Sequence, residues 1–279
     1  MVITHSIRPL LRMLPFQFGK GKLAHYLLQP TEIPIECSRT KSGVLVRMRQ
    51  DKMYRDIYLY GEYEAELTAC IQRIVKPGFI CLDIGANFGY YSVLLAELTE
   101  NSALVHAFEP VPSIYKLTQE TVEQNGVAER VVLNNCGLGV ENGEFTVYTF
   151  TQLPHGHSSS NDLGRPDAVP HRCRVTTLDR YAEEHDLKEV DFIKVDVEGD
   201  ELNVLKGGER LLRRSRATVA FEVNMTCLIA RNLVPEAIED FLRSCGYMEF
   251  LQIRTHRAAR KVPHLAPRVG SDYIAFKIH

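Results

Sequence analysis

The stretch Phe79-Ile-Cys-Leu-Asp-Ile-Gly-Ala-Asn-Phe-Gly-Tyr-Tyr-Ser92, followed by Ala103-Leu-Val-His-Ala-Phe-Glu-Pro110, decides the fold of this 279-residue chain. The apolar run from Phe79 to Ile84 predicts a strand that is covered on both faces. Glycines at 85 and 89 bracket a tight turn, and apolar residues then recur at helical spacing. Glu109 closes a second apolar run. The order of strand, glycine loop, helix, strand and acid predicts a βαβ unit that binds a nucleoside.

The glycine loop, Gly85-Ala-Asn-Phe-Gly89, differs from the dinucleotide fingerprint G-x-G-x-x-G, because Asn87 stands where a second glycine would approach a pyrophosphate. Asp83 precedes the loop, and its carboxylate would repel a pyrophosphate but attract a ligand with an ammonium and a sulfonium. S-adenosylmethionine has both charges, a carboxylate for the helix N-terminus and a ribose for Glu109. The pattern therefore favours S-adenosylmethionine, with a plain βαβ turn as the alternative.

Further motifs follow the glycine loop in a characteristic order. They are Ala107-Phe-Glu-Pro-Val-Pro112, Thr176-Thr-Leu-Asp179, Asp191-Phe-Ile-Lys-Val-Asp-Val-Glu-Gly-Asp-Glu201 and Val204-Leu-Lys-Gly207. With these motifs the chain resembles the FkbM family of S-adenosylmethionine-dependent methyltransferases over residues 50–253. Two places depart from the family pattern. Asp200 stands where a histidine or a small residue is more usual, and His155-Gly-His-Ser-Ser-Ser160 replaces a glycine-serine loop.

The resemblance implies an α/β fold, with a Rossmann-like, seven-stranded class I methyltransferase sheet, helices on both faces and a closing antiparallel strand pair. It implies an S-adenosylmethionine-dependent O-methyltransferase that acts on a hydroxyl of a sugar, a glycan or another small metabolite. In this scheme Asp83 organises the methionyl end, Glu109 binds the ribose, and Asn135 and Cys136 border the adenine. The glycine loop lines the methionyl end through Gly85, Ala86, Asn87 and Gly89.

A second group of acids lies near the end of the strand expected over residues 190–197. Lys194, Asp196 and Glu198 point to one side of an extended strand, where buried charges are unfavourable unless they are paired or used. Because a hydroxyl acceptor must lose a proton, Asp196 is the predicted catalytic residue that binds or deprotonates the acceptor, with Glu198 beside it. A divalent cation bound by these acids together with Glu222 is another alternative, although their spacing is not diagnostic of a metal. A salt-bridged helix entry is the alternative.

Two expected loops are candidates for contact with the acceptor. The polar segment 151–171 carries His155 and His157, and histidine suits a base at neutral pH; incidental histidines in a solvated loop are the alternative. The segment 254–268, expected as a loop between the last two strands, has basic residues and no acid. This charge favours an anionic acceptor, with a solvated charge run as the alternative. Nucleic acid is not expected, because no aromatic residues interleave with the charge.

The composition is that of an ordinary globular protein, with 45% apolar residues, 24% charged residues and a net charge of −2. No apolar run reaches the length of about 18 residues that a membrane span needs. The chain has seven cysteines and no C-x-x-C pair, which predicts reduced core thiols in a cytoplasmic protein. They are Cys37, Cys70, Cys81, Cys136, Cys173, Cys227 and Cys245.

The chain is expected to divide into an appendage, residues 1–75, and a cofactor-binding domain, residues 76–279. The basic, apolar N-terminus predicts a helical arm over residues 1–30 that packs on the body or on a second subunit, with a membrane-surface role as the alternative. Residues 43–48 and 53–60 are expected to pair as a hairpin. Further helices are expected near 62–75, 89–99, 113–125, 200–213 and 238–242, and strands near 79–84, 103–109, 131–135, 144–150, 172–177, 190–197, 217–223, 247–253 and 273–278.

Two rival functions belong to other classes. A nicotinamide-dependent oxidoreductase would need a loop that tolerates a pyrophosphate, which the carboxylate of Asp83 opposes. A non-catalytic module that keeps the fold to bind a partner would not need an intact cofactor loop. Binding of S-adenosylhomocysteine or of NAD separates the methyltransferase from the oxidoreductase.

Overall fold

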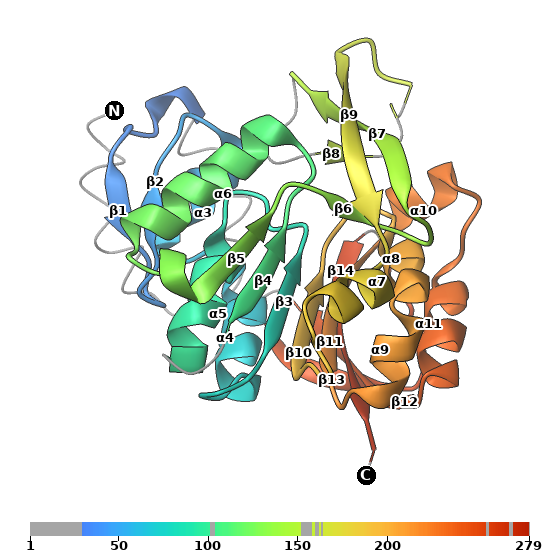
Figure 1. The fold of residues 1–279 in the computed structure, drawn as a ribbon. Coiled ribbons are helices and arrows are strands. Elements are labelled where there is room, and N and C mark those ends of the chain that lie inside the picture. The colour runs from blue at the N-terminus through green and yellow to red at the C-terminus, as the bar shows by residue number, and fades with distance from the viewer. Residues whose placement is uncertain are drawn as a thin grey trace.

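The structure is a computed structural model that describes residues 30–100, 104–151, 158–159, 162, 164–254, 257–267 and 270–278. Within these residues eight strands form one sheet, in the order β13-β12-β14-β11-β10-β3-β4-β5 (Figure 1). Their bounds are β3 Cys81–Ile84, β4 Val105–Phe108, β5 Val131–Asn134, β10 Phe192–Val195, β11 Thr218–Asn224, β12 Tyr247–Arg254, β13 Arg257–Val262 and β14 Gly270–Lys277.

The centre of the sheet is parallel and one edge is antiparallel. β10 pairs in parallel with both β3 and β11, and β3 continues through β4 to β5. β14 runs antiparallel to β11 and to β12. Since the chain moves outward from β3 in one direction and then returns to place β10 on its other side, a topological switch point lies between β3 and β10. Ligands of open α/β sheets bind outside the carboxyl ends of the strands at such a point.

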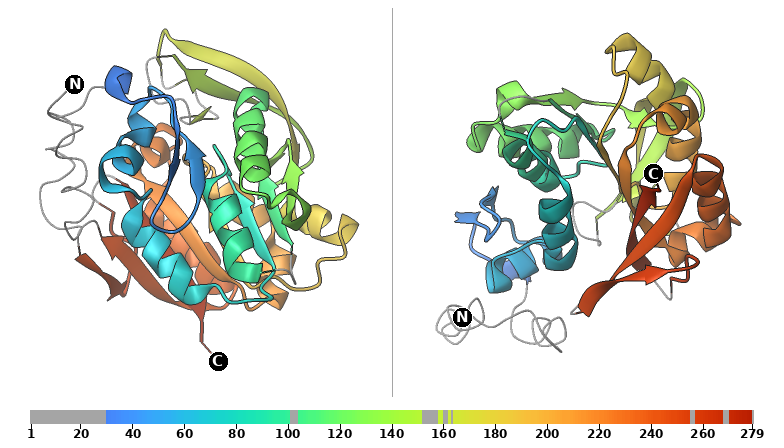
Figure 2. Two further views of the ribbon diagram at one scale, coloured as in Figure 1. Left: turned by 90° about the vertical axis from the view of Figure 1, so that its left-hand side faces the viewer. Right: turned by 90° about the horizontal axis from the view of Figure 1, so that it is seen from below.

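Helices cover both faces of the sheet, as expected (Figures 1 and 2). α4 Ala65–Ile74, α5 Tyr90–Thr99 and α6 Pro112–Gln124 lie on one face. The other face carries α7 Leu178–Glu184, α8 Glu201–Gly207, α9 Glu209–Arg214 and α11 Pro235–Ser244. Neighbouring strand residues alternate between two apolar cores: Cys81 packs with the first group of helices, and Leu82 packs with the second. The sheet is thus buried on both sides where the site lies.

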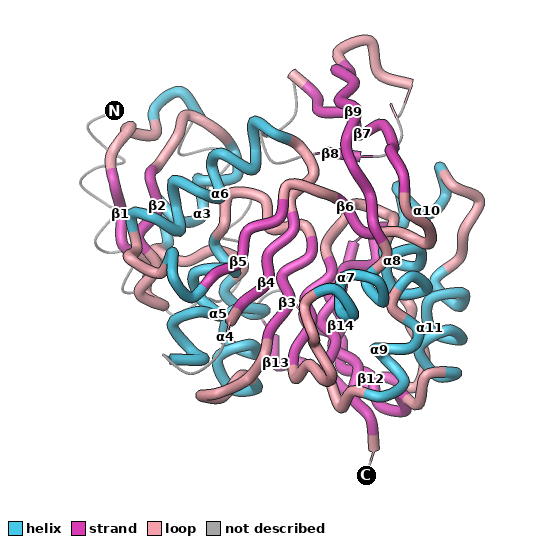
Figure 3. The backbone as a smooth tube through the Cα atoms, viewed as in Figure 1, coloured by secondary structure: helices cyan, strands magenta, loops and turns pink. Residues whose placement is uncertain are grey.

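A smaller sheet stands beyond the carboxyl ends of the parallel strands (Figure 3). Among the described residues it contains four strands in the order β6-β9-β7-β8. Its main pair, β7 and β9, is the expected inserted strand pair. The bounds are β6 Gly137–Leu138, β7 Gly143–Phe150, β8 Ser158–Ser159 and β9 Ala168–Thr176.

The expected hairpin over residues 43–60 is wrong. β2 (Leu45–Arg47) pairs with β1 (Cys37–Arg39), whereas the second half forms η2 (Lys52–Tyr54) and α3 (Arg55–Tyr60). The side chain of Asp51 accepts a hydrogen bond from the amide of Met53 and caps η2, and Gly61 ends α3 in a left-handed conformation. These caps outweigh the strand propensity of the tyrosines and isoleucine between them.

The expected loop over residues 254–268 is also wrong, because its middle forms β13, an eighth strand at the edge of the sheet. In addition, the helix expected over 200–213 divides into α8 and α9 at Gly208. A Cβ on Gly207 would lie 1.9 Å from the carbonyl oxygen of Gly139, so this turn of helix needs glycine where the backbones meet.

The remaining short elements are η1 Pro30–Glu32, η4 Ala128–Arg130 and α10 Met225–Ala230. The seven cysteines are free thiols. In the described part of the chain no helix has both the length and the apolar character that crossing a membrane requires. The N-terminal arm over residues 1–30 lies almost wholly outside the described residues, and the domain boundary at residue 75 stays a prediction.

Candidate functional site

A cavity of about 430 Å³ opens at the carboxyl edge of the sheet. Its walls come from the segments after β3, β4, β5 and β10, from β11 and β14, from the smaller sheet and from residues 52–64. The described lining residues that the sequence predicted are Gly85, Asn87, Glu109, Cys136, Asp196, Glu198 and Glu222. The structure therefore brings the predicted cofactor loop and the predicted catalytic acids to one cavity.

The glycine loop crosses directly over the end of β10. Gly85 has a φ of +84°, and a Cβ added there would lie 1.8 Å from the carbonyl oxygen of Asp196. The amide of Asp196 in turn donates to the carbonyl of Ile84. Glycine is needed here because the turn presses on neighbouring backbone, and this contact fixes the loop beside Asp196.

Gly89 and Ala86 support the loop without lining the cavity. Gly89 precedes α5 with a φ of +85°, and a Cβ there would meet Thr118 of α6 at 3.1 Å. The amides of Gly85 and Ala86 both donate to the carbonyl of Phe108, at 3.0 and 2.9 Å. The loop is thus held to β4 by main-chain bonds before any ligand binds.

Glu109 lies at the end of β4 and is 4% exposed. Its Oε2 accepts from the amide of Asn87 at 3.1 Å, and its Oε1 accepts from the amide of Val111 at 2.9 Å. Burial raises the pKa of this carboxyl to about 8, although both backbone hydrogen bonds act in the opposite direction. Each carboxylate oxygen keeps a lone pair for a further donor, as the two hydroxyls of a ribose require.

Asp83 does not line the cavity. It is fully buried below the loop, and its Oδ2 accepts from the hydroxyl of Ser92 at 2.6 Å. Its register partner on β10 is Lys194, a buried lysine whose Nζ donates to Asp196 at 3.0 Å. Burial first, opposed by the charge of Lys194, raises the pKa of Asp83. Its geometry fits a support beneath the loop, and direct contact with a cofactor's ammonium stays untested.

The two predicted residues that follow β5, Asn135 and Cys136, lie in different positions relative to the cavity. Cys136 lines the cavity, and burial raises the pKa of its thiol. Asn135 does not line it; its amide nitrogen donates to the carbonyls of Glu109 and Pro110, at 2.8 and 3.1 Å. Asn135 thus fixes the turn that carries Glu109. Phe145 of β7 closes the wall beside Gly137, where a Cβ would be only 2.6 Å from its ring.

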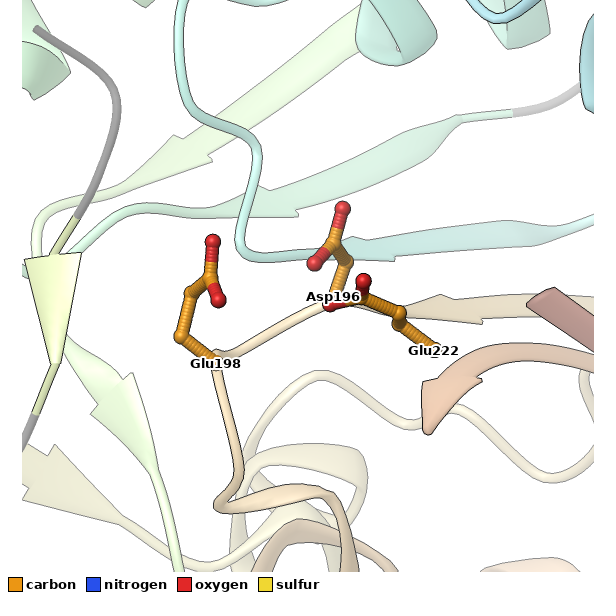
Figure 4. A group of neighbouring side chains, drawn as sticks. All are labelled: Asp196, Glu198 and Glu222. Carbon is orange, nitrogen blue, oxygen red and sulfur yellow. The ribbon is translucent and has the colours of Figure 1, made fainter. Parts of the chain in front are cut away.

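Three acids meet at the ends of β10 and β11 (Figure 4). Asp196, Glu198 and Glu222 each have a carboxylate oxygen within 4.8 Å of those of the other two. Glu198 has a φ of +52°, which is rare for a residue with a side chain. Its carboxylate lies 3.5 Å from the side-chain nitrogen Nδ2 of Asn224. Strain of this kind persists where the surrounding structure holds a functional group in place.

Burial and mutual repulsion govern the protonation of this group. Burial, followed by the charge of Asp196, raises the pKa of Glu198 to about 8 and that of Glu222 to about 10. Asp272 of β14 also lines the cavity, and burial and the charge of Glu64 raise its pKa to about 8. Carboxyls in this range hold protons near neutral pH until a positive charge joins them.

Several lining residues were not predicted from the sequence. Tyr63 and Glu64 come from residues 1–75, the expected appendage, and Glu64 accepts a hydrogen bond from the hydroxyl of Tyr91 at 2.8 Å. Asp272 stands in β14 directly before the apolar run Tyr273-Ile-Ala-Phe276, a signal that could have revealed it. Others include Lys52, Met53, Asp56, Phe145 and Val147, for which the local sequence gives no signal.

His155 and His157 lie outside the described residues, so their predicted role as a base is not tested. Ser158, which follows them, lines the cavity. None of the described residues of 254–268 does so; in that segment Lys261 pairs with Glu249 on the neighbouring strand. Asp200, the departure from the family pattern, lines the cavity and is held by both terminal nitrogens of Arg231.

A parallel sheet closed by an antiparallel pair, with a glycine loop after its first strand and an acid after its second, defines a Rossmann-like class I methyltransferase fold. The chain belongs to the methyltransferase FkbM domain family, whose model matches residues 83–248. The family resemblance read from the sequence is confirmed.

Three curated relatives are similar to this chain at low identity. Methyltransferase 1 of Beauveria bassiana is 31% identical over 45% of this chain and 57% of its own length. Methyltransferase sdnD of Sordaria araneosa is 26% identical over 62% of this chain and 74% of its own length. The 2-O-methyltransferase NoeI of Sinorhizobium fredii is 26% identical over 52% of this chain and 64% of its own length. The chain thus spans little more than half of the first relative.

Proposed function

We propose that this protein is an S-adenosylmethionine-dependent O-methyltransferase that methylates a hydroxyl of a sugar, a glycan or another small metabolite. The proposal rests on one observation above all. A single cavity joins the glycine loop and Glu109, which suit the cofactor, to Asp196, which suits proton removal. Membership of the FkbM domain family supports methyl transfer, and the name of the 2-O-methyltransferase NoeI supports oxygen as the acceptor atom.

The residues at the loop end fit a nucleoside with a methionyl chain. Glu109 offers two carboxylate oxygens to the ribose hydroxyls. The backbone amide of Asn87 donates to one of these oxygens, Oε2, and holds it in place. Phe108, Cys136 and Leu138 supply an apolar wall for the adenine. Gly85 allows the methionyl end to approach the backbone beside Asp196. When bound, the cofactor supplies a methyl group made electrophilic by its sulfonium.

Asp196 is the proposed catalytic base. Its Oδ2 accepts a hydrogen bond from the ammonium of Lys194, which fixes the direction of the carboxylate. Asp196 takes the hydroxyl proton as the new carbon–oxygen bond forms and the carbon–sulfur bond breaks. Glu198 lies beside it and orients the acceptor. His155 and His157 are retained as alternative bases, and a divalent cation held by Asp196, Glu198 and Glu222 is an alternative means of activating the hydroxyl.

Calorimetric titration of the protein with S-adenosylhomocysteine and, separately, with NAD tests the cofactor. We expect binding of the first and none of the second, while the reverse result would favour the oxidoreductase. Incubation with S-adenosylmethionine and a hydroxylated acceptor panel, followed by mass spectrometry, then tests transfer. The product should carry one added methyl group on oxygen, and its formation should be strongly reduced in Asp196→Asn.

A further inference from the structure

A layer of carboxylates crosses three neighbouring strands at the end of the cavity away from Glu109. Lys194 is the register partner of Ala220, so the next residues on the same face are Asp196 and Glu222. Glu222 is in turn the direct antiparallel partner of Asp272. Like charges placed directly opposite each other destabilise a sheet. This arrangement therefore needs a positive charge, or protons, to offset it.

The same end of the cavity receives two further acids from outside the sheet. Glu198 rises from the loop after β10, and Glu64 begins α4. Both have positive φ angles, +52° and +40°, so the backbone adopts an unfavourable conformation at each. The burial-driven rise in the pKa values of Glu198, Glu222 and Asp272 agrees with a shortage of positive charge.

The described basic groups do not balance this charge. Lys194 lies one layer below, and its charge acts on Asp196, Asp83, Glu64 and Asp272, so a single ammonium is shared by these four acids. Arg231 holds Asp200 through both of its terminal nitrogens. Eight carboxylates and one ammonium, that of Lys52, line the described walls. The acids are Asp56, Glu64, Glu109, Asp196, Glu198, Asp200, Glu222 and Asp272.

A buried carboxylate oxygen next to this layer also indicates a shortage of positive charge. Glu201 is fully buried, and its Oε1 accepts from the amides of Val197 and Gly199 at 3.2 and 3.0 Å. Its Oε2 has no hydrogen-bond partner among the described residues. The charge of Glu201 also acts on Glu198 and Glu222, which places it against the acid layer. An unmatched oxygen in the interior is unfavourable unless a bound group compensates for the field around it.

We propose that the acceptor carries a positively charged amine, which the carboxylates of Glu222, Asp272 and Glu198 bind while Asp196 faces the hydroxyl to be methylated. This inference rests on the proposed function and narrows its substrate class to amino sugars and other hydroxylated amines. It replaces the anionic acceptor suggested by segment 254–268, whose described residues lie away from the cavity. An ammonium fits the layer because it can donate to carboxylates on separate strands.

Binding of three matched sugars to the protein saturated with S-adenosylhomocysteine tests the charge of the acceptor. Glucose, glucosamine and glucuronate share a ring and differ in charge, and saturation-transfer NMR with titration gives their dissociation constants. We expect glucosamine to bind at least about tenfold more tightly than glucose, and glucuronate more weakly than either. Equal binding of glucose and glucosamine, tighter binding of glucuronate, or binding of none of the three would overturn the inference.

Two variants and a metal titration separate the remaining explanations. Glu222→Gln and Asp272→Asn keep the side-chain shape and should abolish the preference for glucosamine, whereas Glu129→Gln, on an exposed 3₁₀ turn, should keep it. If Mg²⁺ bound in place of glucosamine and made glucose bind equally well, the layer would be a metal site and the inference would be wrong. Binding of S-adenosylhomocysteine is measured first in every variant. Its loss in the unaltered protein would instead refute the proposed function.

Discussion

The two ends of the cavity satisfy their buried acids in different ways. At the cofactor end, Glu109 receives two backbone amides, and the loop amides of Gly85 and Ala86 bond to Phe108. At the acceptor end, Glu222 faces Asp272 across the sheet, and the nearest ammonium, on Lys194, is shared with other acids. The first end is organised by the main chain. The second depends on protons or on a bound positive charge.

This difference shows which part of the site has its hydrogen bonds in place before a ligand binds. The cofactor end is made from a short stretch of sequence, so substitutions there should disturb folding or cofactor affinity directly. The acceptor end is assembled from distant segments, and its carboxyls respond to pH and to ligand charge. Substitutions at the two ends should therefore give different measurable effects, in the order of size below.

The largest effect is expected for Gly85→Ala at the cofactor end. The new methyl group would lie 1.8 Å from the carbonyl oxygen of Asp196, at a φ of +84°. We expect a loss of about 3 kcal/mol in the free energy of unfolding, measured in urea. Gly126→Ala is the matched control, because Gly126 also has a positive φ but nothing within 4 Å of the added atom. It should lose about 1 kcal/mol. Equal losses would show that the close contact does not matter.

A smaller effect is expected for Glu109→Gln. If the charge of Glu109 binds the ribose hydroxyls as proposed, its removal should weaken the binding of S-adenosylhomocysteine by about 10- to 100-fold in calorimetry. Because the pKa of Glu109 is raised to about 8, the wild-type affinity should increase as the pH rises through 8 and the carboxyl ionises. The variant should lack this dependence. A wild-type affinity that stays constant from pH 6 to about 9 would show that Glu109 does not bind the cofactor.

At the acceptor end, the expected effect is on the pH dependence of stability. Glu198, Glu222 and Asp272 have folded pKa values raised to about 8, 10 and 8. The folded state then binds more protons than the unfolded state above the unfolded pKa values of about 4, so stability should fall as the pH rises from 5 to about 9. Each group contributes at most about 1.4 kcal/mol per pH unit, and partial exposure reduces this limit.

Glu222→Gln should flatten this fall in urea unfolding, and the exposed Glu129→Gln should leave it unchanged. Stability that rises between pH 5 and about 9 would contradict the assigned shortage of positive charge. Saturation with the preferred cationic ligand should also reduce the fall, because the ligand replaces bound protons.

The smallest effect is expected where a lining acid is already paired. Asp200 and Arg231 have side chains only 18% and 16% exposed, whereas those of Glu209 and Arg213 are 47% and 49% exposed. A double-mutant cycle with Asp200→Asn and Arg231→Met should give a coupling of about 1 kcal/mol. The exposed pair should give about 0.3 kcal/mol. Similar couplings in both pairs would mean that Arg231 does not specifically neutralise the cavity wall.

The two ends of the cavity also differ in how much of each could be predicted from the sequence. Gly85, Glu109 and Asp196 belong to contiguous strand–loop units, in which local pattern and position in the sheet determine one another. The predicted family and parallel core are therefore confirmed, and these three residues line one cavity, while their roles stay predictions. Asp83 and Asn135 lie beneath the loops that contact the cavity, a distinction that spacing along the chain does not contain.

The acceptor end depends on contacts between residues far apart in the sequence. Residues 53–60 have strand-forming side chains, but Asp51 and Gly61 cap a helical segment there, and this segment brings Tyr63 and Glu64 to the cavity. The opposition of Glu222 and Asp272 depends on a strand register that is set by the whole sheet. Segment 254–268 reads as a polar loop, yet pairing with β12 makes part of it a strand.

The most direct test of the account is a crystal structure of the protein with S-adenosylhomocysteine. We expect the ribose hydroxyls on the carboxylate of Glu109, the adenine beside Cys136, and the sulfur directed toward Asp196 and the acid layer. A ligand bound elsewhere, or one whose sulfur points away from Asp196, would contradict the central claim that one cavity holds both cofactor and acceptor.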